Sequence, residues 1–530
     1  MKKFDNRMLR LASRTGAFAL AMAAGLAAGQ AWAQSASLAN APLFTSAATQ
    51  VKPNIMFILD DSGSMARDYL PDAAGTFSSG TYGKASSHCN GVAYNPGVKY
   101  LVPVDYKGTP IAAAPDIYKE DPTTTTSQRS VDGTVTIGAV GTTVKVEDVQ
   151  GRRPGSSWYD IGDVVTVYTS STKFIVGTVT AWDPSDREVQ VKITSVVGSG
   201  TMTNPTIGVG EPSTSEYTYY KYKDDTKRDL DFAYDSSGNV IKTNDFYKEC
   251  NYVVDSTSGK LVFDKIKVNG ASAEAQNYAN WYTYYRTRMT MMKSSISHAF
   301  KGLDDTYRIG YSTISEEAVT EGDDFLHVRD FKTGTGEQKE NFYKKFNAAS
   351  PVSYTPLRAA LAKAGKYFAK KGPSQTYDPI QYSCQRNFTI LSTDGFWNTN
   401  DENTTYGPYG LDGVAVGDVD GSLERPMLDV NKAKNTLADV AAYYYQTDLR
   451  TSALNNCSGS ISGVDVCGNN VVGTANKDPY KSFGDAAAWQ HMTTFTLGLG
   501  VAGTLDFDKN YQTIRAGDFH KIVNREKDWP

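Results

Sequence analysis

Three oxygen-bearing side chains alternate in the segment Asp60-Asp61-Ser62-Gly63-Ser64, directly after the apolar run 55–59. Because Asp60, Ser62 and Ser64 alternate, their oxygens can converge on one point above the end of a buried strand. A hard divalent cation such as Mg²⁺ prefers oxygen ligands in a near-octahedral arrangement and keeps water in the remaining positions. The spacing favours a metal site, with a simple polar turn as the alternative, since Asp, Ser and Gly are common turn residues.

Two later segments supply matching side chains. Thr355 comes just before Pro356 and an amphipathic stretch, so it is expected in a loop at the start of a helix. Asp394 follows the apolar run 388–392, which predicts a second buried strand. The carboxyl ends of parallel strands meet at one edge of a sheet, so the sequence predicts that all five oxygens come together.

The rest of the core must position these loops, and its apolar periodicity predicts alternating strands and helices. Strands are expected at 54–59, 307–315, 388–392 and 494–501, with an edge strand around 325–331. Helices are expected near 278–301, 336–349, 356–371 and 429–450. Such alternation favours an α/β fold with a doubly wound, mostly parallel sheet.

The order Asp60-x-Ser62-x-Ser64, then Thr355, then Asp394 resembles the metal-ion-dependent adhesion site (MIDAS) of von Willebrand factor A domains. The resemblance implies a von Willebrand A-like fold with these five residues around Mg²⁺, or Mn²⁺ or Ca²⁺ in its place. It also implies an open coordination position that a partner's carboxylate can fill. We expect this domain to be discontinuous, formed by about 51–70 and 275–529.

An insertion of about two hundred residues, 71–274, separates the two parts of this domain. Within it, 131–203 is rich in Val, Thr, Ile and Gly with two-residue alternation, as in 165–168 and 189–193. This pattern predicts a small all-β module inserted in a surface loop. Asp418-Val419-Asp420-Gly421, in the later part of the chain, matches only a fragment of a calcium-loop pattern and is interpreted as a surface turn.

The first 33 residues combine a basic head, a short apolar stretch and Ala31-Trp32-Ala33, which predicts a cleaved secretory signal peptide followed by a linker at 34–50. No later segment is apolar enough to predict a transmembrane helix. The formal net charge of −4 and the lack of a dense Lys/Arg cluster argue against nucleic-acid binding. We expect an exported protein of the periplasm, the outer surface or a pilus tip.

Five cysteines occur in the 530 residues, and export to an oxidising compartment favours disulfides. Cys457 and Cys467 share one loop and are the easiest pair to close. Cys89 and Cys250 bracket the long insertion and could join its ends. Cys384 is then left over, either free or paired with another chain.

Several further stretches resemble the N-terminal half of the PilY-type family of type IV pilus tip adhesins and biogenesis factors. They include Pro53–Met65, Asn280–Met289, Thr393–Asn398 and Leu437–Tyr445. The resemblance implies a role in type IV pilus assembly, twitching motility and adhesion, with minor pilins, the pilus tip or a host surface as partners. Members of that family carry a C-terminal β-propeller with a calcium loop, and this chain is expected to stop about where that half begins.

Three functions follow as hypotheses. The first is a metal-dependent binding module of the pilus, and the second a structural scaffold for pilus biogenesis in which the metal site is inert. The third, a metal-dependent hydrolase, is disfavoured because the five histidines are scattered and match no H-E-x-x-H spacing. No G-x-S-x-G motif is present either. We therefore expect a protein that is not an enzyme.

Overall fold

The computed structural model describes most of the chain from Val51 to Trp529. The described ranges are 51–111, 120–121, 123, 125–147, 149–150, 159–170, 172–214, 217–224, 226–228, 232–235, 239–268, 273–352, 354–398, 402–473, 485–500, 505–506, 508–511 and 513–529. The predicted signal peptide at 1–33 and linker at 34–50 lie outside them. Among the helices of these ranges, none has the length and apolar character needed to cross a membrane.

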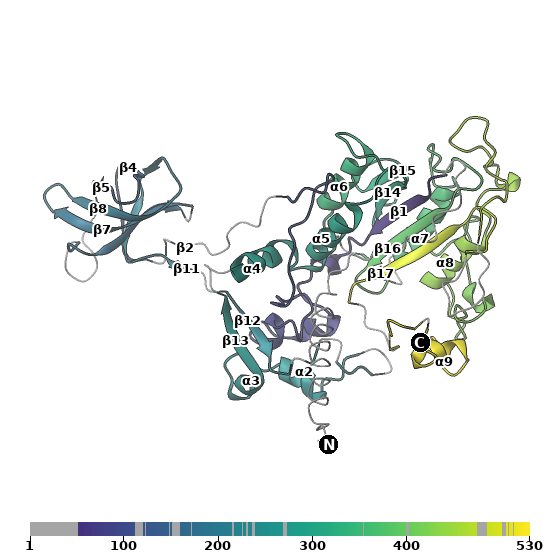
Figure 1. The fold of residues 1–530 in the computed structure, drawn as a ribbon, viewed down its shortest axis with the longest axis horizontal. Helices are drawn as coiled ribbons and strands as arrows, with labels where there is room; N and C mark the ends of the chain where they lie inside the picture. The colour runs from purple at the N-terminus through teal and green to yellow at the C-terminus, as the bar shows by residue number, and fades with distance from the viewer. Residues whose placement is uncertain are drawn as a thin grey trace, which may run out of the picture.

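A five-stranded sheet lies at the centre of the larger part of the molecule, in the order β15-β14-β1-β16-β17 (Figure 1). The strands are β1 (Asn54–Leu59), β14 (Arg308–Thr313), β15 (Phe325–Asp330), β16 (Asn387–Thr393) and β17 (Met492–Gly498). β1 pairs in parallel with both β14 and β16, β16 pairs in parallel with β17, and β15 is an antiparallel edge strand. All five match strands expected from the sequence.

Helices cover both faces of this sheet, which explains why β1 is apolar at consecutive positions. Phe57 packs on one face against α5 (Arg288–Phe300) and α6 (Gln338–Ala348). Met56 and Ile58 point to the other face, against α7 (Leu357–Phe368) and α8 (Leu437–Gln446). A strand with both faces covered has no solvent-facing side that would favour alternate polar residues.

Buried polar side chains join the starts of four neighbouring chain segments at one end of the sheet. Arg308 Nη1 donates to Asn54 Oδ1 at 2.7 Å, and Asn54 Nδ2 donates to Asn387 Oδ1 at 2.9 Å. Asn387 Nδ2 in turn donates to Gln490 Oε1 at 2.9 Å, just before β17. We call Arg308, Asn54, Asn387 and Gln490 the amide row; none of them is more than 2% exposed.

Two predicted helices are wrong in extent, for local reasons. The stretch 278–301 forms two helices, α4 (Ala273–Tyr284) and α5, because Thr287 and Thr290 make a capping box that starts a new helix. α8 begins at Leu437 and not near 429, because Thr436 and Asp439 make a second capping box. The aromatic stripe predicted along one long helix is therefore divided, with Tyr278 packed in a separate cluster from Met289.

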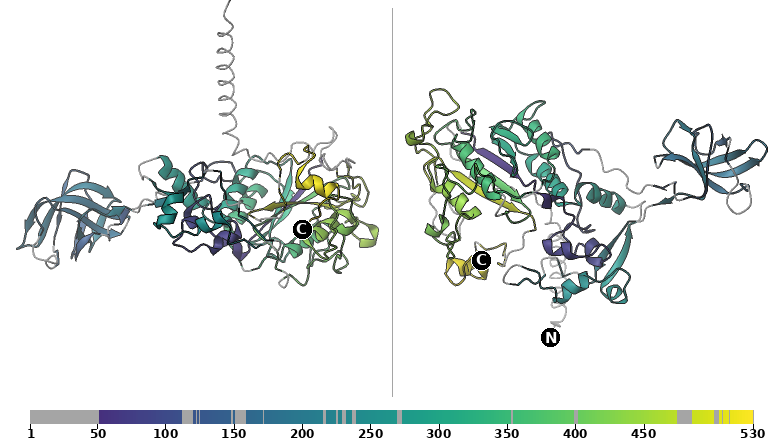
Figure 2. Two further views of the ribbon diagram at one scale, coloured as in Figure 1. Left: turned by 90° about the horizontal axis from the view of Figure 1, so that it is seen from below. Right: turned by 180° about the vertical axis from the view of Figure 1, so that it is seen from behind.

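The insertion holds an all-β module that stands apart from the sheet domain in every view (Figure 2). Its sheet has the order β3-β10-β6-β7-β8-β5, all antiparallel, around a valine-rich core. The strands of this sheet are β3 (Thr126–Ser130), β5 (Thr143–Val146), β6 (Val164–Ser170), β7 (Lys173–Asp183), β8 (Glu188–Val197) and β10 (Thr206–Val209). The module also contains β4 (Thr134–Thr136) and β9 (Thr201–Thr203), which pair as a separate two-stranded antiparallel sheet. The strands of the module extend beyond the expected 131–203, since β3 and β10 pair as the entering and leaving strands.

Short elements connect the module to the sheet domain. They are β2 (Glu120–Asp121), β11 (Ser213–Thr214), β12 (Tyr217–Tyr222), α2 (Asp245–Cys250), α3 (Thr257–Val262) and β13 (Phe263–Val268). The remaining elements are α9 (Gly517–Val523) and the 3₁₀ turns η1 (Gly63–Ala66), η2 (Asp72–Thr76), η3 (Tyr82–Ala85), η6 (Asp420–Ser422) and η7 (Ser452–Leu454). Disulfides join Cys89 to Cys250 and Cys457 to Cys467, and Cys384 is free, which confirms both expected pairings.

Candidate metal site at the end of strands β1 and β16

The strand order reverses between β1 and β16. From β1 the chain passes to β14 and β15 on one side, and later returns to β16 and β17 on the other. In open α/β sheets, ligands bind beyond the carboxyl ends of the strands at such a reversal, because the flanking loops diverge and leave a crevice. Asp60 directly follows β1 and Asp394 directly follows β16, so both carboxylates lie at this point.

Four of the five predicted ligands are joined by hydrogen bonds. Ser62 N donates to Asp60 Oδ1 at 2.8 Å, and the hydroxyls of Ser62 and Ser64 lie 2.9 Å apart. Ser64 Oγ donates to Asp394 Oδ1 at 2.7 Å, and Asp394 N donates to Asp60 Oδ2 at 3.2 Å. The alternation of Asp60, Ser62 and Ser64 therefore places their oxygens on one side of the turn, facing the loop after β16.

Thr355 lies on the third loop, directly before α7. This loop contacts the first one, because Val352 N donates to the main-chain oxygen of Asp61 at 2.5 Å. It also contacts the loop after β16, since Thr355 N donates to Asn398 Oδ1 at 2.7 Å. In the described part of the chain, the Thr355 hydroxyl makes no hydrogen bond to the other four predicted ligands. The structure thus brings the loop of Thr355 to the site without joining its side chain to it.

Arg288, the first residue of α5, is a member of the site that sequence reasoning missed. Its guanidinium is 1% exposed, and Nη1 lies 2.9 Å from Asp394 Oδ2 while Nη2 lies 2.6 Å from Asp72 Oδ1. Nε also donates to the main-chain oxygen of Tyr69 at 2.8 Å. The sequence offered a signal in Arg286-Thr287-Arg288, but a continuous helix was expected there, which left no reason to place Arg288 at a helix start beside the site.

Burial and like charge act together on Asp60. Its side chain is fully buried, and desolvation raises its pKa above 3.8, with a further upward contribution from the charge of Asp394. Hydrogen bonds from Ser62 oppose this rise. Burial also raises the pKa of Asp61, whose carboxylate accepts from the hydroxyl and the main-chain N–H of Ser315. Among the described residues, Asp60 has no ion pair, and Arg288 pairs with Asp394 and Asp72 but not with Asp60.

This donor set fits a hard divalent cation. Two buried carboxylates and two hydroxyls converge within hydrogen-bonding distance, and oxygen donors of this kind are those that Mg²⁺ and Ca²⁺ prefer. Among the described residues, Arg288 pairs with Asp394 and no cationic side chain pairs with Asp60, so the site has an uncompensated negative charge that a cation would neutralise. Ser392, which receives Asp60 N at 3.2 Å and donates to Ile58 O at 3.1 Å, holds the two strand ends together beneath it.

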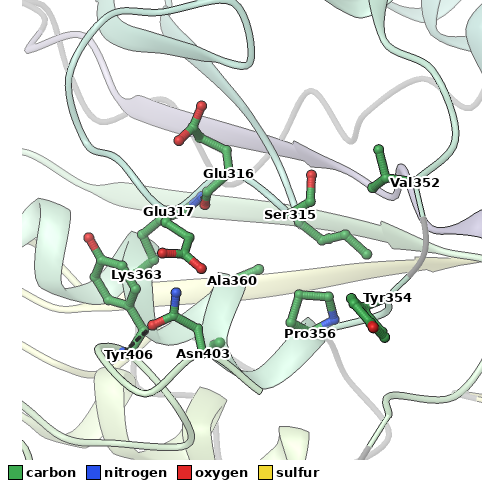
Figure 3. A pocket seen from close by; sticks show the side chains of 12 residues that line it. Ser315, Glu316, Glu317, Val352, Tyr354, Pro356, Ala360, Lys363, Asn403 and Tyr406 are labelled. Carbon is green, nitrogen blue, oxygen red and sulfur yellow. Dashed lines mark hydrogen bonds between the residues drawn. The ribbon is translucent and has the colours of Figure 1, made fainter. Parts of the chain in front are cut away.

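A hollow of about 290 Å³ lies next to the Thr355 loop, and Figure 3 shows the side chains that line it. Ser315, the partner of Asp61, lines it together with Val352 and Tyr354 of the Thr355 loop. Lys363 closes its inner wall, where burial lowers the pKa of its ammonium to about 8. The hollow therefore borders the loop that carries Thr355.

Comparison with known proteins finds relatives of one kind. The chain is 30% identical over 291 residues to the type IV pilus biogenesis factor PilY1 of Pseudomonas aeruginosa strain PAK, covering 51% of this chain and 23% of that protein. It is 26% identical over 498 residues to PilY1 of strain PAO1, covering 91% of this chain and 34% of the relative. PilY1 of strain UCBPP-PA14 gives 26% over 487 residues, with the same two shares.

This chain is a relative of PilY1. The resemblance read from the sequence to a PilY-type protein is confirmed. The chain spans only about a third or less of the length of the PilY1 proteins it matches. No family model matches it. No solved structure matches it either.

Proposed function

We propose that this chain acts in type IV pilus biogenesis, and that its sheet domain is a von Willebrand A-like module that binds a partner's carboxylate through Mg²⁺. The similarity to the three PilY1 proteins, which are type IV pilus biogenesis factors, supports the first part. The convergence of Asp60, Ser62, Ser64 and Asp394 where the strand order reverses supports the second, and it is the single observation that carries the proposal.

Each side chain has a distinct task in this proposal. Asp60 and Asp394 supply negative charge, and Ser62 and Ser64 supply neutral oxygens that turn from each other toward the cation. Arg288 holds Asp394 in place from the side opposite Ser64. Thr355, on the loop that contacts both other loops, would offer the fifth oxygen if that loop moved toward the site. A bound Mg²⁺ would leave a coordination position that a hard anion such as a carboxylate can occupy.

Apolar side chains on the same loops favour a protein partner. Tyr354 is 57% exposed, Phe396 72% and Val352 42%, and these residues flank Thr355 and Asp394 in sequence. Exposed aromatic residues are enriched where proteins bind one another, because they bury a large area at a small entropic cost. We propose that a minor pilin, another pilus-tip protein or a host surface protein places a carboxylate at the cation and packs against these side chains.

This function requires export, in agreement with the expected signal peptide, and a site in the periplasm, on the outer surface or at the pilus tip. A scaffold with an inert site is the second candidate. It is favoured by one observation, the buried ion pair between Arg288 and Asp394, which already satisfies one oxygen of that ligand. A hydrolase has no comparable support in the described part of the chain.

Binding of the metal is tested first, by calorimetric titration of Mg²⁺ and Mn²⁺. We expect one site per chain and its loss in Asp60→Asn, which removes a charge at nearly constant shape. Asp68→Asn is the matched control, because Asp68 is in the same segment but its side chain is 62% exposed and paired with Lys84. Equal affinity in the wild type and in Asp60→Asn would refute the site.

The role of the site in pilus biogenesis is tested by complementing a strain that lacks the gene. The full-length gene carries Ser62→Ala plus Ser64→Ala, and the control carries Ser78→Ala plus Ser79→Ala, two exposed serines nearby. We expect the first pair to reduce surface piliation, twitching motility or adhesion at matched protein levels, and the control pair to behave as wild type. Normal behaviour of both would favour the inert scaffold.

A further inference from the structure

A second group of carboxylates lies away from β1, at the start of α8. One oxygen each of Asp418, Asp420 and Asp439 lies within 4.8 Å of the other two. Asp418 and Asp420 come from the loop before α8 and its turn η6, and Asp439 from the first turn of the helix. Asp420 is 4% exposed and Asp439 is fully buried, so the expectation of a plain surface turn at 418–421 is wrong for Asp420.

The carboxylates of two of these three residues, Asp439 and Asp418, accept hydrogen bonds from main-chain N–H groups. Asp439 Oδ2 accepts from Thr436 N at 2.8 Å, and Oδ1 accepts from Val419 N at 2.6 Å and from Asp420 N at 3.2 Å. Asp418 Oδ1 accepts from Gly421 N at 3.0 Å. These bonds fix the loop and the helix start relative to each other and orient the two carboxylates.

Asp420 is different, because its Oδ1 is buried and has no hydrogen-bond partner. A buried polar atom without a partner costs free energy, and a buried carboxylate costs more. Among the described residues, no lysine or arginine forms an ion pair with Asp418, Asp420 or Asp439. Burial, and after it the charge of Asp439, raises the pKa of Asp420 to about 7. The loop thus holds a buried acidic side chain that no cationic side chain of the described residues compensates.

We propose that Asp418, Asp420 and Asp439 bind a calcium ion. One carboxylate oxygen from each of the three residues lies close to the other two, and the buried side chain of Asp420 has an oxygen without a partner that a cation could satisfy. Ca²⁺ accepts six to eight oxygens in irregular arrangements, whereas Mg²⁺ requires a near-ideal octahedron. Ligands from an irregular loop and a helix start, completed by water, suit the less demanding cation.

Such an ion would connect the loop to the core of the sheet domain. α8 packs against α7, where Tyr444 lies against Gly365, and α7 follows directly after the Thr355 loop. The calcium site and the site at the end of β1 share no residue. Ca²⁺ at the former should therefore stabilise the fold, and should do so whether or not the latter binds metal.

The test uses the whole chain with Asp60→Asn, so that only the second site is measured, and calcium chloride alone as the probe. Calorimetry should show one Ca²⁺ per chain. Adding Asp420→Asn should weaken binding by about tenfold or more, because affinity follows the number of charged ligands. Asp412→Asn, in the same loop but outside the cluster, is the control and should change nothing.

Asp418→Asn is the second variant, because it alters a half-exposed ligand without touching the cap of α8, and it too should weaken binding. The thermal midpoint of the Asp60→Asn chain should rise with Ca²⁺, and this rise should disappear with Asp420→Asn. Unchanged Ca²⁺ binding in both cluster variants would overturn the proposal. So would a chain that takes up no Ca²⁺ near neutral pH and becomes more stable on acidification, since Asp420 would then be a protonated carboxyl group that donates to Asp439.

Discussion

Replacement of Arg288 by methionine should have opposite effects on two properties: it should lower the stability of the metal-free fold and raise the affinity of the site for Mg²⁺. Arg288 is the only cationic side chain, among the described residues, that pairs with Asp394, and both are essentially inaccessible to solvent. In Arg288→Met the carboxylates of Asp394 and Asp60 remain buried together with no positive charge. We therefore expect a large loss of stability without metal and a smaller loss with it.

The size of the effect follows from the contacts. The bond to Asp72 contributes little, because that carboxylate is 59% exposed and screened by water. The bond to Asp394 is fully buried, and breaking one partner of a buried pair costs about 3–5 kcal/mol. A bound cation restores part of this loss by compensating Asp394. Without the nearby guanidinium, Mg²⁺ should also bind more tightly to Arg288→Met than to the wild type.

The assay is urea unfolding followed by circular dichroism, with and without saturating Mg²⁺. Arg67→Met is the matched control, since Arg67 pairs with the same Asp72 at 3.0 Å but is 40% exposed and does not reach Asp394. It should change the free energy of unfolding by less than about 1 kcal/mol. The reasoning fails if Arg288→Met behaves like this control, or if Mg²⁺ stabilises Arg288→Met no more than it stabilises the wild type.

Three further outcomes are expected. Because burial raises the pKa of Asp60, its contribution to the stability of the metal-free fold is present at low pH and is lost as the pH rises through that pKa. The affinity for Mg²⁺ should change in the opposite sense and weaken as the pH falls toward that pKa, as measured by calorimetric titration at a series of pH values. Binding that does not depend on pH would contradict this. Replacing 126–209 by a short Gly/Ser linker should leave the Mg²⁺ affinity and the circular dichroism of the sheet domain intact, because a loop insertion with its own core costs its host little closure entropy. If the shortened protein is insoluble, the β module is a necessary part of the sheet domain. Gly365→Ala should lower the free energy of unfolding by about 1–3 kcal/mol in urea, since the new Cβ would lie 2.2 Å from the Tyr444 ring. Gly302→Ala is the control, because a Cβ at Gly302 would have no atom within 4 Å. Equal stability of the two variants would refute the close approach of Tyr444 to Gly365.

The strands and the position of the carboxylates could be predicted from the sequence because each depends on short-range patterns. The apolar run before Asp60 and the one before Asp394 mark strands covered on both faces, and the polar residues after them mark the strand ends. The helix boundaries could not be predicted from apolar spacing alone. The break before Arg288 depends on a threonine pair that competes locally with helix continuation.

The contacts within the site also fall into two groups, local ones that could be predicted from the sequence and long-range ones that could not. The alternation of Asp60, Ser62 and Ser64 is a local feature, and their convergence could be expected from it. The pairing of Arg288 with Asp394 joins residues 106 positions apart, and the orphan oxygen of Asp420 depends on how a loop folds over a helix start. The spacing of apolar residues in the sequence does not indicate such contacts, because they depend on tertiary packing.

The amide row aligns the starts of β1 and β16, so the number of residues in each strand determines where Asp60 and Asp394 lie. Asn54 pairs with Asn387 in register, β1 then runs for six residues to Asp60, and β16 for seven to Asp394. A slip of one residue would displace a strand by about 3.3 Å and turn its side chains to the opposite face. A single-residue deletion in either strand should therefore separate the two carboxylates even though it lies far from them. A change in the length of the insertion leaves these two strands unaltered, whereas a change in the length of either strand would move one carboxylate relative to the other.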